Sequence, residues 1–169
     1  MPRSCAIEEF ASVGVEPEGI TIASLDQEFA ALHRRSRELT EAMPFEIFYG
    51  NPGTPMRVVA AHSPGENILR SAAVVEQTFG GITANLWDDP FEWTLPETLS
   101  TRELVIQYLD EVEEVRRRAF MSFRQKADLL KEVALPSGRN RSLIDLLLDT
   151  LARASEYHQR AAGILKTLS

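Results

Sequence analysis

The chain has 169 residues, of which 44 % are hydrophobic and 25 % charged, and its formal net charge at pH 7 is −7. This length and composition indicate one folded domain over residues 1–169, and the negative charge argues against binding to nucleic acid or to an anionic membrane. No apolar run approaches the roughly 18 residues of a membrane span. The single cysteine, Cys5, excludes an internal disulfide and fits a reducing cytoplasm, where we expect the protein to reside.

Four helix-start signals follow residues 1–21, a segment with no clear period that we expect to be a partly ordered arm. Three signals are Ser-x-x-Glu/Gln capping boxes, in which two side chains satisfy free backbone amides of the first turn. These boxes begin at Ser24, Ser63 and Ser100. The fourth signal is Ser142, followed by Asp145, whose charge suits the positive end of a helix dipole. Each signal predicts one helix.

Apolar residues recur at three- and four-residue steps after each signal, which is typical of helices with one buried face. The predicted helices cover about 25–43, 64–86, 101–131 and 143–168. Turn-rich segments separate them, and residues 56–62 predict either a short strand or an extended stretch. Gly80 and Gly81 fall inside the second helix, where we expect them to allow close approach of a neighbouring helix rather than a kink beside a pocket. The pattern predicts an all-α protein, most simply a four-helix bundle.

The three histidines are the candidate metal ligands, because several common catalytic motifs are absent from the sequence. His33 lies among charged residues and is expected to face solvent, whereas His62 precedes the Ser63 cap and is expected to support the helix start. Only His158 belongs to an apolar helix face. Since a metal site needs several converging ligands, His158 by itself predicts either a core histidine or the remnant of a metal site.

Three segments carry a resemblance to a known family: SPGENILRSAAVVEQTF, STRELVIQYLDEVEEVRRRAF and SLIDLLLDTLARASEYHQRAAGIL. Over residues 24–168 the chain resembles the DinB/YfiT-like superfamily of bacterial four-helix proteins. The resemblance implies a divalent metal, often zinc or nickel, held by a histidine of the second helix and an H-x-x-x-H pair of the fourth. It also implies metal-dependent transfer of low-molecular-weight thiols, in which the metal lowers the thiol pKa.

The residues at these family positions are mostly not histidines. The family histidine of the second helix stands about five residues before a glutamate, which places Ser71 at its position, before Glu76. The pair in the fourth helix falls on Ala154 and His158, or on His158 and Ala162 in the alternative register. We therefore expect a degenerate metal site with no cofactor and a pocket formed by Ser71, Glu76, Ala154 and His158. The alternative is residual zinc or nickel binding, completed by an oxygen of Glu76.

The small side chains at positions 71 and 154 leave space around His158 in the predicted bundle. Some of that space predicts a pocket near the loop that carries Trp87 and Trp93. The alternative is a closed core in which the space is filled by Phe79, Tyr108 or Tyr157.

From these residues we expect a DinB-like protein without catalytic activity that binds a small molecule or has a stress-related role. One alternative is a thiol-transferase-type or hydrolase-type enzyme with an atypical site around His158 as general base. Another is a dimeric structural or interaction module. We also expect a homodimer, because the long third helix and the segment LWDDPFEW offer apolar surface beyond the needs of one core.

Overall fold

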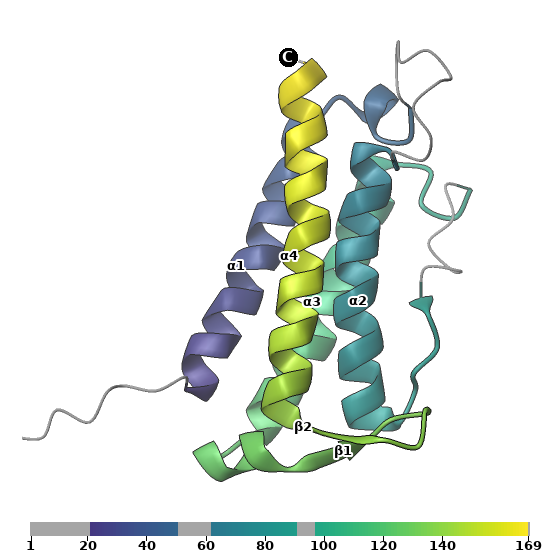
Figure 1. Ribbon diagram of the computed structural model, residues 1–169. Coiled ribbons are helices and arrows are strands. Elements are labelled where there is room, and N and C mark those ends of the chain that lie inside the picture. The colour runs from purple at the N-terminus through teal and green to yellow at the C-terminus, as the bar shows by residue number, and fades with distance from the viewer. Residues whose placement is uncertain (1–20, 51–61, 91–96, 169) are drawn as a thin grey trace, which may run out of the picture.

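The computed structural model describes residues 21–50, 62–90 and 97–168, which are mostly helical. Four long helices run side by side (Figure 1). They are α1 Ile22–Ala42, α2 Pro64–Ala84, α3 Arg102–Ser122 and α4 Leu143–Leu168. The prediction of four helices is confirmed. The predicted N-terminal arm and the stretch predicted for residues 56–62 lie outside the described residues, except for Thr21 and His62. No described helix is both long enough and apolar enough to cross a membrane.

In chain order, the four helices run up, down, down and up (Figure 1). Because α2 and α3 point the same way, the connection between them has to return from one end of the helices to the other. α2 packs mainly against α4 and α3, and α1 packs against α3 and α4. Among the described elements, the helices that carry Ser71 and His158 therefore share the most extensive interface.

Local capping chemistry sets the start of two helices as predicted. At α2, the Ser63 hydroxyl accepts a hydrogen bond from the Glu66 amide (3.1 Å), and the Glu66 carboxylate accepts one from the Ser63 amide (2.7 Å). At α4, the Ser142 hydroxyl accepts a hydrogen bond from the Asp145 amide (3.3 Å). Both predicted caps are confirmed. Each joins residues only three positions apart, so the local sequence contains both partners.

Two other predicted starts are wrong by one to three residues. α1 is capped by Thr21, whose hydroxyl accepts from the Ser24 amide (3.0 Å), so Ser24 is the third helical residue and not the cap. α3 is capped by Thr101, which accepts from the Leu104 amide (3.3 Å), and not by Ser100. Threonine and serine offer the same capping hydroxyl, so a sequence pattern does not separate neighbouring candidates.

The third helix is shorter than predicted, because α3 ends at Ser122 and not near residue 131. A local structure replaces its last turns. The Asp128 carboxylate accepts hydrogen bonds from the backbone amides of Arg124 (2.8 Å) and Gln125 (3.0 Å). The Lys131 ammonium, 2.7 Å away, and these two amides lower the pKa of Asp128 to about 2. This carboxylate stabilises the start of the 3-10 helix η3 Lys126–Leu130.

A short antiparallel hairpin that the sequence did not predict joins η3 to α4. It consists of β1 Glu132–Ala134 and β2 Asn140–Ser142, with Glu132 opposite Ser142. Gly138 adopts a positive φ of 76° in the connecting loop, a conformation that glycine favours. Strands of three residues are too short to show the alternation by which strands are recognised.

Three phenylalanines from three helices form the centre of the core. The ring centroid of Phe29 in α1 lies 5.3 Å from that of Phe79 in α2 and 5.8 Å from that of Phe120 in α3. The ring centroids of Phe79 and Phe120 are 5.6 Å apart. Aromatic contacts at this spacing add to the stabilisation from burial. The buried residues Leu147 and Ala154 of α4 belong to the same core.

Gly81 accommodates the segment that follows α2 and not, as predicted, a neighbouring helix. A Cβ atom on Gly81 would lie 2.4 Å from carbons of the Trp87 indole ring. The Gln77 side-chain amide donates a hydrogen bond to the Trp87 carbonyl (2.9 Å), and the Trp87 indole N–H donates to the Asn85 side chain (3.1 Å). The chain therefore folds back onto its own helix at this point.

Candidate functional site

Ser71 and Ala154, the two small residues that the resemblance places at ligand positions, contact each other across the α2–α4 interface. The Ser71 hydroxyl donates a hydrogen bond to the Ala154 carbonyl oxygen (2.8 Å), and both residues are buried. A side chain of one helix that bonds the backbone of another requires the helices to approach closely, which the small side chain at position 154 permits. The structure thus brings together two of the four candidate residues.

His158 lies one helical turn beyond Ala154 and contacts α1. Its Nδ1 atom is 3.2 Å from the Ser36 hydroxyl. Burial lowers the pKa of His158, and the Arg35 guanidinium lowers it further. The imidazole is therefore neutral at pH 7. A neutral, half-buried imidazole with a hydroxyl partner is the environment of a core histidine.

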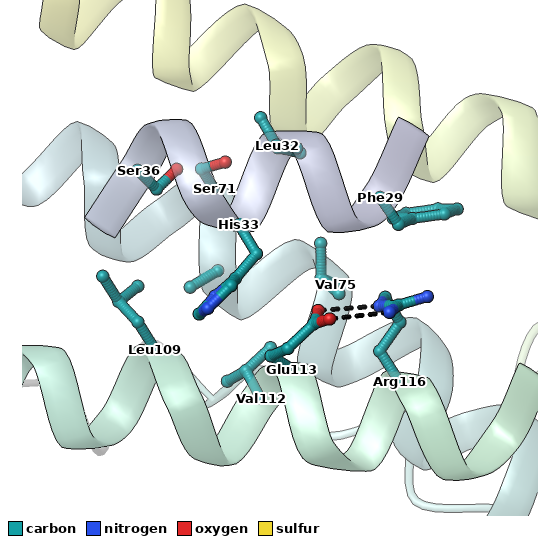
Figure 2. A pocket seen from close by; sticks show the side chains of 11 residues that line it. Phe29, Leu32, His33, Ser36, Ser71, Val75, Leu109, Val112, Glu113 and Arg116 are labelled. Atoms are coloured by element: carbon teal, nitrogen blue, oxygen red, sulfur yellow. Dashed lines mark hydrogen bonds and ion pairs between the residues drawn. The ribbon is translucent and has the colours of Figure 1, made fainter. Parts of the chain in front are cut away.

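A small cavity lies beside Ser71, between α1, α2 and α3 (Figure 2). Figure 2 shows Ser36 and His33 on α1, Ser71 on α2 and Glu113 on α3 around it. Its volume is about 30 Å³, which is the share of one water molecule in the liquid. The cavity is therefore too small for an organic ligand.

This cavity differs in place from the predicted pocket. Trp87, which was expected near the pocket, packs on Gly81, and Trp93 lies outside the described residues. The three aromatic residues expected to fill the space do not line the cavity either; they are Phe79, Tyr108 and Tyr157. Instead, Phe29 and five aliphatic side chains share its wall with the polar side chains of His33, Ser36, Ser71, Glu113 and Arg116.

Charged groups from α1 and α3 meet at the cavity wall. The buried Arg116 guanidinium pairs with the Glu113 carboxylate (2.6 Å) and with Asp26 of α1. His33 Nε2 lies 3.4 Å from the Asp110 carboxylate, and its side chain is only 19 % exposed. The prediction that His33 faces solvent is therefore wrong. The neighbouring Arg34 and Arg35 are exposed, whereas His33 turns toward Asp110 of α3, which Arg37 also contacts.

The remaining histidine, His62, lies at the start of α2. Its backbone carbonyl accepts a hydrogen bond from the Asn67 side-chain amide (3.1 Å). The same amide donates to the Ser63 carbonyl (3.0 Å). His62 thus supports the helix start through its backbone, in agreement with the predicted role.

Glu76, the fourth candidate, faces α3 and not the contact between Ser71 and Ala154. The Tyr108 hydroxyl donates a hydrogen bond to its Oε2 atom (2.7 Å). Burial raises the pKa of Glu76, the Tyr108 hydrogen bond opposes this, and the Glu111 carboxylate adds to the rise. The five-residue step from Ser71 turns the side chain by about 140° around the helix axis. The structure therefore does not bring Glu76 to His158.

Glu76 lines two surface hollows between α2 and α3. One has a volume of about 330 Å³. We call it the Glu76 groove, after its residues Glu76, Leu99, Leu104, Gln107, Tyr108 and Glu111. The other, of about 690 Å³, lies toward the C-terminal ends of both helices. Hollows of this size are typical of sites for small molecules.

The residues at the family ligand positions do not fit a three-histidine metal site. The Ser71 hydroxyl is engaged with a carbonyl, the Ala154 methyl has no donor atom, and only His158 supplies an imidazole. Within residues 21–50, 62–90 and 97–168, no three His, Cys, Asp or Glu side chains are grouped so that they hold a metal ion. The metal chemistry that the resemblance implies lacks its ligands in this part of the chain.

Comparison of the chain with protein-family models, with curated proteins and with solved structures gave no match. The resemblance to the DinB/YfiT-like superfamily therefore rests on the three helical segments of the sequence.

Proposed function

We propose that the chain is a non-catalytic, DinB-like protein that binds a small molecule in the Glu76 groove. The observation that carries this proposal is the hydrogen bond from Ser71 to the Ala154 carbonyl. It supports the alignment with the superfamily, because two positions assigned to family ligands meet across α2 and α4. It also supports the loss of metal chemistry, because neither side chain at this contact is an imidazole.

The size of the two spaces favours the groove over the helix interior as the ligand site. The interior cavity beside Ser71 has room for one water molecule, at about 30 Å³. The Glu76 groove is about ten times larger, at about 330 Å³, and combines apolar walls with carboxylates. The alternative of a hydrolase that uses His158 as a general base gains no such support, since His158 lines neither the interior cavity nor the Glu76 groove.

The first prediction concerns what the purified protein carries. We expect native mass spectrometry of tag-free protein to show less than stoichiometric zinc or nickel, because one imidazole of three is present. Spectra recorded after the protein is mixed with a metabolite extract are expected to show an increase in mass from a bound organic compound. A metal-to-protein ratio near one after dialysis would contradict the loss of metal chemistry. Failure of any organic compound to bind would contradict the binding role and favour the structural module.

The second prediction is the homodimer. Leu86 near the end of α2 and Met121 near the end of α3 are each 61 % exposed, so apolar surface remains at this end of the molecule. We expect light scattering at tens of micromolar to give twice the chain mass of 18.9 kDa. Met121→Glu is expected to shift the protein to the single-chain mass. A single-chain mass for the parent at this concentration would count against the dimer.

A further inference from the structure

The Glu76 groove has an unusual combination of charge and apolar surface. Two carboxylates, Glu76 from α2 and Glu111 from α3, lie in its lining together with the Gln107 amide. Leu99, Leu104 and the Tyr108 side chain supply apolar and aromatic wall. No lysine or arginine belongs to this lining within the residues that the structure describes. The groove therefore carries negative charge that no cation of its own wall neutralises.

The Glu76 carboxyl group is held in a fixed position in the groove. Its Oε2 atom is held by the Tyr108 hydroxyl at 2.7 Å, which fixes the carboxyl group against α3. Burial, together with the Glu111 carboxylate, raises the pKa of Glu76. Arg118, which lines the neighbouring hollow, is paired with Glu114 at 3.4 Å on its own helix. A cation that enters the groove would thus relieve an unfavourable pair of carboxylates.

We infer that the Glu76 groove binds an organic ammonium ion with an apolar or aromatic body. This inference rests on the proposed function and names the class of its ligand. The ammonium group would donate charge-assisted hydrogen bonds to Glu76 and Glu111, which are stronger than neutral ones. The body would pack on Leu99 and Leu104, and the Tyr108 ring adds a surface that attracts cations. An anion would meet two carboxylates, and a bare metal ion would leave the apolar wall unused.

The test compares four probes that differ in charge and in whether they carry an aromatic body. Amide chemical shifts of the full-length, ¹⁵N-labelled protein are recorded with benzylammonium chloride, benzyl alcohol, sodium benzoate and magnesium chloride. We expect benzylammonium to shift residues around Glu76 and Tyr108 in a saturable way, and the other three to shift them little. Glu76→Gln, which keeps an acceptor for Tyr108, is expected to weaken benzylammonium binding about tenfold.

Two further variants test whether binding depends on the carboxylates of the groove. Glu111→Gln replaces a carboxylate on the exposed side of the groove and is expected to weaken benzylammonium binding as well. Glu38→Gln removes an exposed carboxylate of α1 that does not line the groove and is expected to leave binding unchanged.

The outcomes separate this inference from the proposed function. Equal or tighter binding of benzyl alcohol, benzoate or magnesium in the groove would overturn the ammonium ligand while leaving a binding role intact. Absence of benzylammonium binding would also overturn it, and so would full affinity in Glu76→Gln. The binding role itself fails separately, when no compound of the metabolite extract adds mass to the protein.

Discussion

Replacing both Ser71 and Ala154 by histidine is expected to create a zinc site together with His158. In the parent, Ser71 contacts the backbone of Ala154 directly, and His158 follows one turn later on the same helix. Positions four apart share a helix face, so three imidazoles would converge at the α2–α4 interface. We expect a zinc Kd below about 1 µM for the double variant, and a rise in melting temperature on adding zinc.

The metal-free double variant is expected to be less stable than the parent. It loses the hydrogen bond from Ser71 and places two larger side chains at positions that are 2 % and 0 % exposed, beside a cavity of only about 30 Å³. Overpacking of this kind costs about 1–3 kcal/mol. Urea unfolding with and without zinc measures both effects, since a ligand that binds only the folded state adds to its stability.

A matched variant tests the register of this site. Ser71→His combined with Ala162→His places the second imidazole on the other side of His158. We expect weaker zinc binding from it, because the observed contact of Ser71 is with residue 154. If the Ser71→His, Ala154→His variant folds but binds zinc no better than the parent, the alignment is wrong. His158 would then be an ordinary core histidine.

The second large effect is expected from Gly65→Ala in the first turn of α2. A Cβ atom at this position would lie 2.2 Å from Phe48 Cδ1 and 2.4 Å from the Phe48 carbonyl oxygen. The same carbonyl accepts a hydrogen bond from the Gly65 amide (2.9 Å), and Phe48 is fully buried. Because neither the ring nor the backbone can yield easily, we expect a loss of about 3 kcal/mol in the free energy of unfolding, measured with urea.

Gly163→Ala in α4 is the matched control for this substitution. Apart from its two chain neighbours and the backbone of its own helix, no residue has an atom within 4 Å of a Cβ built on Gly163. Alanine is favoured over glycine inside a helix by about 1 kcal/mol, so this variant is expected to be more stable than the parent. Equal stability of Gly65→Ala and the parent would show that Phe48 does not pack against the start of α2.

Helix positions were predictable where the signal is local. The Ser63–Glu66 and Ser142–Asp145 caps join residues three apart, so the sequence alone contains both partners. The end of the third helix was not predictable in this way. Its apolar and charged residues continue a helical period past Ser122, whereas Asp128 stabilises a competing turn through the amides of Arg124 and Gln125. Both structures are local, because Asp128 lies only three and four residues from these amides, so the sequence pattern does not choose between them.

The candidate site shows the same division. That positions 71 and 154 lack imidazoles, and that His158 lies on an apolar face, follows from the sequence alone. The partners of the site residues do not. Ser71 bonds Ala154 across 83 positions, and Tyr108 bonds Glu76 across 32. The sequence pattern marks Tyr108 only as a core residue and does not mark Ser36, because no local pattern identifies the partner of a distant side chain.

Four helices, their buried faces and the absence of imidazoles at positions 71 and 154 follow from the sequence. These features depend on local periodicity, capping and residue type. The contact of Ser71 with α4 and the orientation of Glu76 toward α3 follow only from the packing of the helices. The groove also arises only there, since its carboxylates come from two helices and part of its wall from residues before α3. Helix packing sets which distant faces meet, and helical period alone does not specify the partner of a face.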